Sequence, residues 1–420
     1  MFKRNTHTLL ISALVSIFLL AACQPPQAAP SFECTDAIGC VTIAPGDPIK
    51  LAAIQVLSAD LALAGTEHVQ SVELAIDKRD GQLLGHPIAL QKEDSKCSPE
   101  GGANAALKVV ADPQVLAIIG PLCSGAAATA GEVMSESGLI MVSGANTAPS
   151  LTSVGGAPGD DWQPGYFRTT HNDSVKGRVA AVFALQELGV TKAATINDGE
   201  IFSQQFVQVF EQTFKELGGE IVLSTAVNKG DTDMQPVLTA VEMSGAELLF
   251  FPLVSPEGDF VVQQIKEVPN LENVFLLSDD ALLSAAFMEG LGPENDREIY
   301  FFTPAVPEAQ DELAAEYEAK YGEKLSFSFY SFTYDATNMV LNAIEAVAVQ
   351  EPDGTLHIGR QALREAMYNT SGFEGVTGTL TCDKFGDCGT SKFYVVKLDG
   401  TTADVDAVKA NIVYTYTPDS

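Results

Sequence analysis

The chain has 420 residues, of which 46% are hydrophobic and 19% charged, a composition typical of a well-packed globular protein rather than a disordered one. Acidic residues outnumber basic ones 55 to 24, which gives a formal net charge of −31 with no basic stripe in the sequence. Such a surface repels phosphate backbones and anionic lipid head groups, so nucleic acid is a poor partner and solubility explains the charge.

The first residues predict an export signal. Lys3 and Arg4 form a basic start, residues 9–20 form an apolar run too short for a comfortable membrane span, and small residues precede Cys23. Lipoprotein signals share the Leu-Ala-Ala-Cys pattern of residues 20–23, and this resemblance implies that Cys23 becomes the new N-terminus and carries a diacylglyceryl group. The alternative is ordinary secretion, with Cys23 discarded or left free.

A flexible tether follows this signal, because residues 24–30 are rich in proline. We expect a signal peptide over residues 1–22 and a lipid-anchored tether over residues 23–47. The resulting location is extracytoplasmic, with the protein anchored to the membrane by its N-terminal lipid.

Six cysteines remain after Cys23, and an even number in an exported chain predicts disulfides. Their spacing suggests the pairs Cys34 with Cys40, Cys97 with Cys123, and Cys382 with Cys388. None of the spacings is the Cys-x-x-Cys of a zinc site, and the five histidines are scattered along the chain. We therefore predict no structural metal, and we predict no cofactor.

From residue 49 onward, short β-branched or apolar runs alternate with amphipathic helical stretches, which predicts parallel sheets flanked by helices. The expected strands cover residues 50–57, 87–92, 115–120, 139–143, 193–197, 220–226, 247–253, 274–278 and 298–303. The expected helices cover residues 68–77, 103–111, 175–188, 204–217, 234–243, 308–321 and 331–348. A glycine-rich β segment is expected over residues 372–398.

This is more than one open sheet usually holds, so we predict two lobes. Glycine and proline punctuate residues 151–165, which we interpret as a loop or crossing strand between the lobes. This segment carries Trp162, the one tryptophan of the chain, which is more often a loop anchor or core residue than a ligand contact.

The densest candidate site follows the expected strand at residues 115–120. A turn with glycine and serine leads into a helical run there, and free N–H groups at the positive end of the helix dipole favour an anion. Ser124 lies where an N-cap residue would lie, so one interpretation is that it only caps its own helix. The other is that Ser124 and the adjacent amides hold a ligand carboxylate, and a Cys97–Cys123 bridge beside the turn favours this.

Two further segments are expected at the same crevice. Ala145 and Thr147 follow the strand at residues 139–143, and ligands of doubly wound folds lie beyond the carboxyl ends of the strands. In the second lobe, Phe202 follows one strand end and Asp279 another, where an aromatic ring and a carboxylate can contact a ligand side chain and a ligand ammonium. Asp279 and its neighbour Asp280 could instead be plain helix caps.

A catalytic constellation is not recognised in the sequence. It has no Gly-x-Ser-x-Gly elbow, Walker-type loop, His-Glu-x-x-His or dinucleotide-binding Gly-x-Gly-x-x-Gly after a strand. We therefore expect a binding protein and not an enzyme.

The chain resembles the periplasmic solute-binding proteins for branched-chain amino acids, which serve ATP-driven (ABC) importers. The resemblance spans nearly the whole chain from about residue 49. It rests on four segments, namely Gly-Pro-Leu-Cys-Ser-Gly at residues 120–125, Ser-Gly-Ala-Asn-Thr-Ala-Pro at 143–149, Phe-Arg-Thr-Thr at 167–170 with Asp173, and Gly-Val-Thr-Gly at 375–378 with Asp383, Gly386 and Asp387.

The resemblance implies an α/β fold of two doubly wound parallel-sheet lobes joined by a multi-strand hinge, the type I arrangement. The implied first lobe is residues 48–166 plus 303–376, and the implied second lobe is residues 167–302 plus 377–416.

The resemblance also assigns roles to the candidate residues. Ser124 gives its hydroxyl and amide to the ligand carboxylate, and Ala145 and Thr147 add contacts to the carboxylate and ammonium. The family's ammonium-binding acid falls on Asp279, often a glutamate there, and an aromatic that closes over the ligand falls on Phe202, usually a tyrosine. The positions matching Cys97 and Cys123 form a disulfide.

Two departures concern the side-chain pocket. Better-known members have aromatic residues at two positions that correspond to Ala64 and to a site near Val254 in this chain. The loss of these rings enlarges or reshapes the pocket and puts leucine, isoleucine or valine in doubt as the ligand.

The sequence thus predicts a monomeric, lipid-anchored receptor that captures a small amino acid and hands it to an ABC permease. The rival hypotheses are an extracellular sensor or amide or urea receptor of the same fold, and a lipid-anchored hydrolase, against which the missing nucleophile argues.

Overall fold

The structure is a computed structural model that describes residues 32–58, 60–291, 297–305, 307, 309–325, 327, 329–402 and 404–417. The expected signal peptide, Cys23 and the start of the tether lie outside these residues. The described residues up to Thr35 belong to one unit and those from Asp36 onward to a second one. All that follows concerns the second unit, apart from one remark on Cys34.

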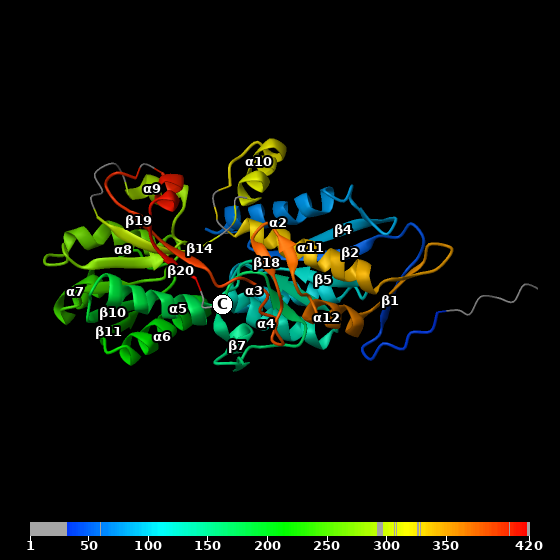
Figure 1. Cartoon of the computed structure of the whole chain (residues 1–420), viewed down its shortest axis with the longest axis horizontal. Coiled ribbons are helices and arrows are strands. Elements are labelled where there is room, and N and C mark those ends of the chain that lie inside the picture. The colour runs from blue at the N-terminus through cyan, green and yellow to red at the C-terminus, as the bar shows by residue number, and fades with distance from the viewer. Residues whose placement is uncertain are drawn as a thin grey trace, which may run out of the picture. The chain divides into compact units, whose positions relative to one another are not determined.

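The first lobe is built on a six-stranded sheet (Figure 1). Its strands, in spatial order, are β3 (Gln82–Leu83), β4 (His86–Asp94), β2 (Ile49–Gln55), β5 (Val115–Ile119), β6 (Ile140–Ser143) and β9 (Tyr166–Arg168). All neighbours are parallel except β3, which pairs antiparallel with β4. Helices cover both faces of this sheet, as parallel strands buried on two sides require.

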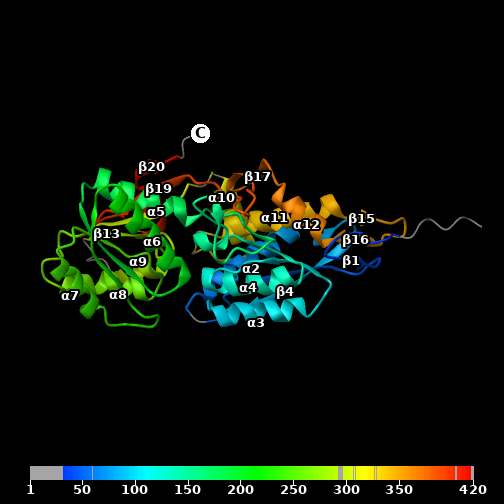
Figure 2. The ribbon, with the colours of Figure 1, turned by 90° about the horizontal axis from the view of Figure 1, so that it is seen from below.

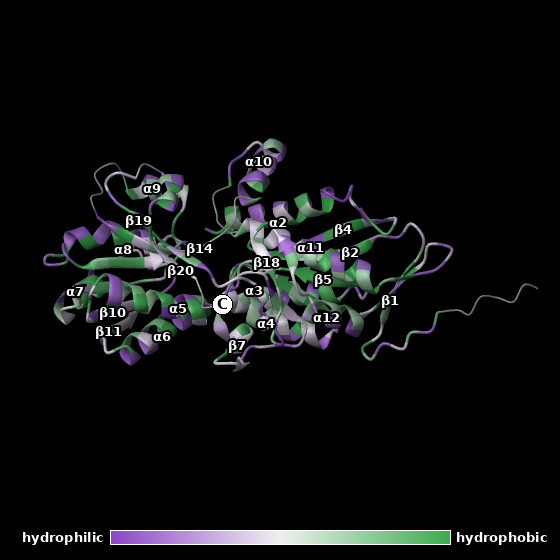
Figure 3. Cartoon of the chain, in the orientation of Figure 1, coloured by the Kyte–Doolittle hydropathy of each residue, from purple (hydrophilic) through white to green (hydrophobic). Residues whose placement is uncertain are grey.

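One face of this sheet packs against α2 (Ala62–Asp77), α11 (Tyr330–Val347) and α12 (Arg360–Tyr368). The other face packs against α3 (Pro99–Val110) and α4 (Ser124–Glu136) (Figure 2). A further helix, α10 (Ala309–Tyr321), contacts α2 through Leu313 and Tyr317. Strands β2 and β5 are coloured mainly as hydrophobic in Figure 3, which agrees with their buried side chains.

The second lobe is built on a seven-stranded sheet. Its strands, in spatial order, are β11 (Glu220–Ala226), β10 (Lys192–Asn197), β12 (Leu248–Phe250), β13 (Phe275–Asp279), β14 (Ile299–Pro304), β19 (Phe393–Leu398) and β20 (Ile412–Tyr416). The first five are parallel, β19 pairs antiparallel with β14, and β20 pairs antiparallel with β19. In β12, Leu248 and Phe250 join the core on one face and Leu249 the core on the other, so this strand is buried on both sides.

Helices again cover both faces of the second sheet. On one face lie α5 (Asp173–Val182), its π-helical continuation η2 (Phe183–Glu187) and α6 (Ile201–Glu216). On the other lie α7 (Gln235–Ser244), α8 (Glu257–Gln264), η3 (Ile265–Glu267), α9 (Ala285–Leu291) and α13 (Val405–Ala410). The predicted fold class, two doubly wound α/β lobes, is confirmed.

Two sequence expectations about the first lobe need correction. Residues 40–43 are not tether: they form β1 (Cys40–Ile43), which pairs with β16 (Leu356–Gly359) and, through it, with β15 (Val349–Gln350). Val41 and Ile43 are buried in the core of the first lobe, so burial of two alternating apolar residues starts the folded part before residue 48.

Residues 151–165 are not the crossing between lobes. They follow η1 (Pro149–Leu151) into a short hairpin, β7 (Ser153–Val154) and β8 (Ala157–Pro158), and then into β9, which pairs with β6 in the first sheet. The chain changes lobe only after Arg168. Trp162 anchors this loop, because its indole N–H donates to the carbonyl of Phe385 at 3.0 Å.

Candidate functional site

A cavity of about 100 Å³ lies beyond the carboxyl ends of the strands of both sheets. The five parallel strands of each lobe have the spatial order 2-1-3-4-5. The cavity is lined by segments that follow strands 1 and 3 of this order, which are β2 and β5 in the first lobe and β10 and β12 in the second. These are the switch points of the two sheets, where doubly wound folds bind ligands. The lining residues are Leu61, Ala64, His68, Cys97, Leu122, Cys123, Ser124, Ala145, Thr147, Lys176, Asp198, Glu200, Phe202, Lys229, Val254, Asp279, Asp280, Ala281, Phe327 and Phe329.

All five residues predicted to contact a ligand line this one cavity: Ser124, Ala145 and Thr147 from the first lobe, and Phe202 and Asp279 from the second. The two positions where the sequence departs from the resembling family, Ala64 and Val254, also line it. The folding therefore brings the predicted residues together, while their contacts to a ligand stay a prediction.

Ser124 is the first residue of α4 and not its N-cap, which is Cys123. Its hydroxyl accepts the N–H of Ala148 at 3.4 Å, in the loop that carries Ala145 and Thr147. The simple capping interpretation of Ser124 is therefore wrong, because the helix begins one residue earlier than expected.

The predicted disulfides Cys97–Cys123 and Cys382–Cys388 are both present. The first fixes the residue before Ser124 to the loop after β4, and both of its cysteines line the cavity. Cys34 and Cys40 are each disulfide-bonded, and their mutual pairing stays a prediction.

The loop that carries Ala145 and Thr147 is held from inside the first lobe. The hydroxyl of Ser143 accepts the N–H groups of Ala145 and Asn146, both at 3.0 Å, and the Asn146 side chain donates to the carbonyl of Leu122 at 2.9 Å. These bonds set the loop against the turn before Ser124, so the two first-lobe segments form one wall.

The second-lobe wall contains a buried charge cluster that the sequence did not reveal. The ammonium of Lys176, on α5, makes an ion pair with Asp279 and lies 3.3 Å from Asp280 Oδ1. Asp173, at the start of the same helix, is also buried and lies 3.4 Å from the imidazole of His171. Three carboxylates thus surround one lysine.

The pKa values of this cluster follow from burial and from the excess of carboxylates. Burial raises the pKa of Asp279 to about 7, Lys176 opposes the rise, and Asp280 and Asp173 add to it. Burial alone would lower the pKa of Lys176, but these three carboxylates raise it, so the lysine stays charged. Burial and the nearby Lys176 lower the pKa of His171, which keeps its ring neutral.

Asp279 and Asp280 are not helix caps, which was the alternative interpretation. Asp279 ends β13 and its Oδ1 accepts the N–H of Ala281 at 3.0 Å in a local turn. The first turn of α9 is instead served by Ser284, whose hydroxyl accepts the N–H of Phe287 at 3.1 Å.

The rest of the cavity lining is mainly apolar, apart from Asp198, Glu200 and Lys229 of the second lobe. His68 is buried, bonds to the hydroxyl of Thr333 at 2.7 Å, and has a pKa lowered to about 4 by burial, so it is neutral near pH 7. Phe202, Phe329 and Val254 provide apolar surface that suits a small aliphatic or aromatic group.

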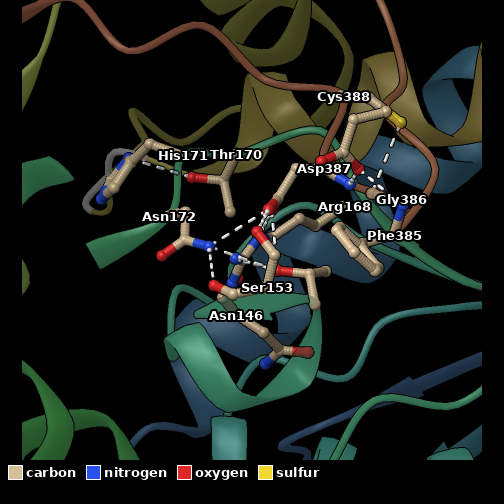
Figure 4. Close-up of polar contacts among 12 residues, drawn as sticks. Asn146, Ser153, Arg168, Thr170, His171, Asn172, Phe385, Gly386, Asp387 and Cys388 are labelled. Carbon is tan, nitrogen blue, oxygen red and sulfur yellow. Dashed lines mark hydrogen bonds and ion pairs between the residues drawn. The ribbon is translucent and has the colours of Figure 1, made fainter. Parts of the chain in front are cut away.

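Behind the first-lobe wall, the buried Arg168 ties the cavity loop to the crossing between lobes (Figure 4). Its guanidinium donates to the carbonyls of Asn146 at 3.2 Å and Ala148 at 2.9 Å, and its Nε donates to Asp387 Oδ1 at 2.5 Å. It also bonds to the hydroxyl of Thr152. Arg168 therefore supports the loop of Ala145 and Thr147 from the side opposite the cavity.

Lys176 and Glu200 are the main site residues that sequence reasoning missed. A signal for Lys176 was present: it shares a helical face with Ala180 and Phe183, which are both buried, and a lysine in an apolar stripe requires a partner. Glu200 gives no comparable signal, because its partner Gly125 lies in the other lobe.

Two α/β lobes that close a small, partly charged cavity between their switch points define a two-lobed ligand-binding protein. The chain matches the family model described as periplasmic binding protein over residues 48–403, and it belongs to this family. In the part of the chain that the structure describes, no helix has both the length and the apolar character needed to cross a bilayer.

Known relatives and solved structures agree with this assignment. A Leu/Ile/Val-binding protein of Rhizobium johnstonii is 27% identical over 241 residues, which cover 57% of this chain and 63% of that protein. Leu/Ile/Val-binding protein homolog 3 of Brucella melitensis is 24% identical over 357 residues, 84% and 91% of the two chains. The chain thus spans less than two thirds of the first of these relatives and most of the second.

The fold is similar to two solved structures in particular. One is a leucine-binding protein of Thermotoga maritima, with a TM-score of 0.73 and 22% identity over 88% of this chain and 99% of that one. The other is a solute-binding protein of R. palustris in complex with 4-hydroxybenzoate, with a TM-score of 0.74 and 19% identity over 88% and 97%. These proteins are named as binding or solute-binding proteins and not as enzymes.

Proposed function

We propose that this protein captures a small α-amino acid with an apolar side chain between its lobes and delivers it to an ABC importer. The observation that carries the proposal is the single cavity in which Ser124, Ala145 and Thr147 face Asp279 and Phe202. The first wall offers hydroxyl and peptide N–H groups to a carboxylate, and the second offers a carboxylate to an ammonium. The names of the relatives support an amino acid as the ligand class.

The residue ranges of the two lobes and the membrane anchor belong to the same proposal. We assign residues 40–168 with 309–380 to the first lobe and residues 173–304 with 393–416 to the second, in place of the expected 48–166 with 303–376 and 167–302 with 377–416, because parts of β1, β9 and β14 fall outside the expected limits. Cys23 carries a lipid that keeps the monomeric receptor at the membrane beside its permease.

A second ligand class is a carboxylic acid that lacks an amine. The ion pair of Lys176 with Asp279 favours it, because this pairing already supplies the cation that an ammonium would bring. The complex of a structural neighbour with 4-hydroxybenzoate supports the same class. The carboxylate of an amine-free acid would bind the wall that contains Ser124 in the same way, and Asp279 would keep its ion pair with Lys176.

Calorimetry with three matched compounds tests the proposal: leucine, 4-methylpentanoate, which lacks the amine, and leucinamide, which lacks the carboxylate. We expect leucine to bind best and Ser124→Ala to weaken it about tenfold, since one charge-assisted hydrogen bond is lost. Ser137→Ala, at the exposed end of the same helix, is the control and should leave the affinity unchanged. Equal affinity in wild type, Ser124→Ala and Asp279→Asn would show that the cavity is not the ligand site.

The pH dependence of affinity separates the two ligand classes. Because the pKa of Asp279 is raised to about 7, the empty site holds a proton on this carboxyl below that pH. An ammonium ligand requires the ionised form, so its affinity should rise between pH 6 and 8 with release of a proton. An amine-free acid should bind more tightly at pH 6, and titrations in buffers of different ionisation enthalpy report the proton count directly.

A further inference from the structure

The start of helix α6 makes direct contacts with the first lobe that involve no ligand. Glu200, the N-cap of α6, accepts the N–H of Phe202 in its own helix at 2.6 Å with Oε2. Its other oxygen, Oε1, accepts the N–H of Gly125 in the first turn of α4 at 2.8 Å. One carboxylate therefore joins the N-termini of a helix from each lobe, where both helix dipoles favour negative charge.

Two neighbouring side chains of α6 contact the first lobe as well. Gln205 makes a reciprocal pair with Ser150: its Nε2 donates to the serine hydroxyl at 2.8 Å and its Oε1 accepts the serine N–H at 3.0 Å. Ile201 packs against the apolar core cluster behind α3 and α4. A carboxylate, an amide and an aliphatic side chain thus contact the first lobe from a single turn and a half of helix.

The lack of a side chain at Gly125 leaves room for the Glu200 carboxylate beside the start of α4. A Cβ atom at this position would lie 2.8 Å from Glu200 Oε1, closer than side-chain carbons pack against oxygen. A side chain at Gly125 would therefore displace the Glu200 carboxylate from its present position.

We propose that Glu200 and Gln205 are positioning residues that hold the two lobes together. Their contacts increase the fraction of protein in the closed state and thereby increase the apparent affinity for ligand. The inference rests on the proposed function, because it assumes that the cavity between the lobes binds the ligand. Apparent affinity falls in proportion to the fraction of protein in the binding-competent state. A contact made only in the closed state therefore tightens the binding of every ligand by the same factor.

Gln205→Ala is the cleanest test, since Gln205 does not line the cavity and lies beside an exposed control residue on the same helix, Gln208. We expect Gln205→Ala to weaken every ligand that binds the wild type by about three- to tenfold, by one common factor, while Gln208→Ala changes nothing. Small-angle X-ray scattering of the ligand-free protein should show a larger radius of gyration for Gln205→Ala than for wild type or Gln208→Ala.

Three variants test the carboxylate contact. Glu200→Ala and Gly125→Ala should each increase the ligand-free radius of gyration, the second with Glu200 still in place. Glu200→Gln should recover part of the effect, because its amide oxygen can still accept the Gly125 N–H. Hydrogen exchange should detect a less protected Gly125 amide in Glu200→Ala, with α4 otherwise unchanged.

Three outcomes would overturn the inference. Unchanged scattering and affinity in Gln205→Ala and Glu200→Ala would show that these contacts do not hold the lobes. A gain of affinity in Glu200→Ala for carboxylate ligands alone would make Glu200 a competitor for the ligand. Different factors for different ligands in Gln205→Ala would indicate a direct contact. If wild type binds no tested ligand, the proposed function fails, while the scattering and exchange of ligand-free protein still decide the role of Glu200 and Gln205.

Discussion

Replacing Lys176 by methionine is expected to destabilise the protein by about 3–5 kcal/mol at pH 8, because the change leaves buried carboxylates without their cation. Asp279 and Asp280 both lie against the Lys176 ammonium, and Asp173 is close enough to raise its pKa. Methionine has nearly the same length as the lysine stem, so the loss reports charge rather than volume. Urea unfolding measures it.

The loss should be smaller at pH 5 than at pH 8. Carboxyls with raised pKa values bind protons in the folded state that the unfolded chain has already released, so the variant's stability falls as pH rises above about 4. Lys215→Met is the control, because Lys215 is exposed and its pair with Glu211 at 3.6 Å is worth at most about 1 kcal/mol. Equal losses in the two variants would mean that the cluster contributes nothing through its charge.

Replacing Arg168 by methionine should cost at least about 4 kcal/mol and weaken ligand binding as well. The change removes the partner of Asp387 and the donors to the carbonyls of Asn146 and Ala148, so a carboxylate and a loop both lose their bonds. Urea unfolding gives the first effect, and calorimetry on the protein that remains folded gives the second.

Arg168→Lys keeps the charge but not the planar fork, so we expect it to keep the ion pair, lose the loop contacts and be intermediate in stability. Burial raises the pKa of Asp387, but the charge and hydrogen bond of Arg168 together with hydrogen bonds from Asn172 and Thr152 lower it overall. The contribution of the ionised carboxylate to stability is therefore present above about pH 4 and is lost as pH falls below it. Arg79→Met, which removes a partly exposed pair with Glu345, is the control at about 0–1 kcal/mol. A loss of that size in Arg168→Met would contradict the role given to Arg168.

The sequence predicted elements well where one local signal dominates. Residues 220–226 were expected as a strand and form β11 with those bounds, because β-branched and apolar residues lie between a glycine pair and a polar turn. The strand expected over residues 247–253 is only three residues long, β12, although residues 251 and 253 are buried as well. Pro252 has no N–H for the ladder, so burial and pairing end at different residues there.

The candidate site was predictable in part for a similar reason. Ser124, Ala145, Thr147, Phe202 and Asp279 all follow strand ends, and strand ends of parallel sheets meet at one edge, so local pattern and fold rule together place them at one cavity. The residue that pairs with the charge of Asp279 could not be predicted in this way. Lys176 and Asp279 are separated by 103 positions of unrelated sequence, and only the folded sheet makes them neighbours.

The crossing segments have a mechanical consequence. Arg168 N donates to the carbonyl of Gly386 at 2.9 Å, and Cys388 N donates to the carbonyl of Arg168 at 3.0 Å, so the outgoing and returning chains are bonded side by side. Gly386 has φ +93°, and a Cβ there would lie 2.2 Å from the carbonyl oxygen of Tyr166, which keeps the two chains in this close register. Two crossing segments that are hydrogen-bonded to each other bend together and resist sliding past one another. A hinge motion of one lobe relative to the other should therefore follow a single direction.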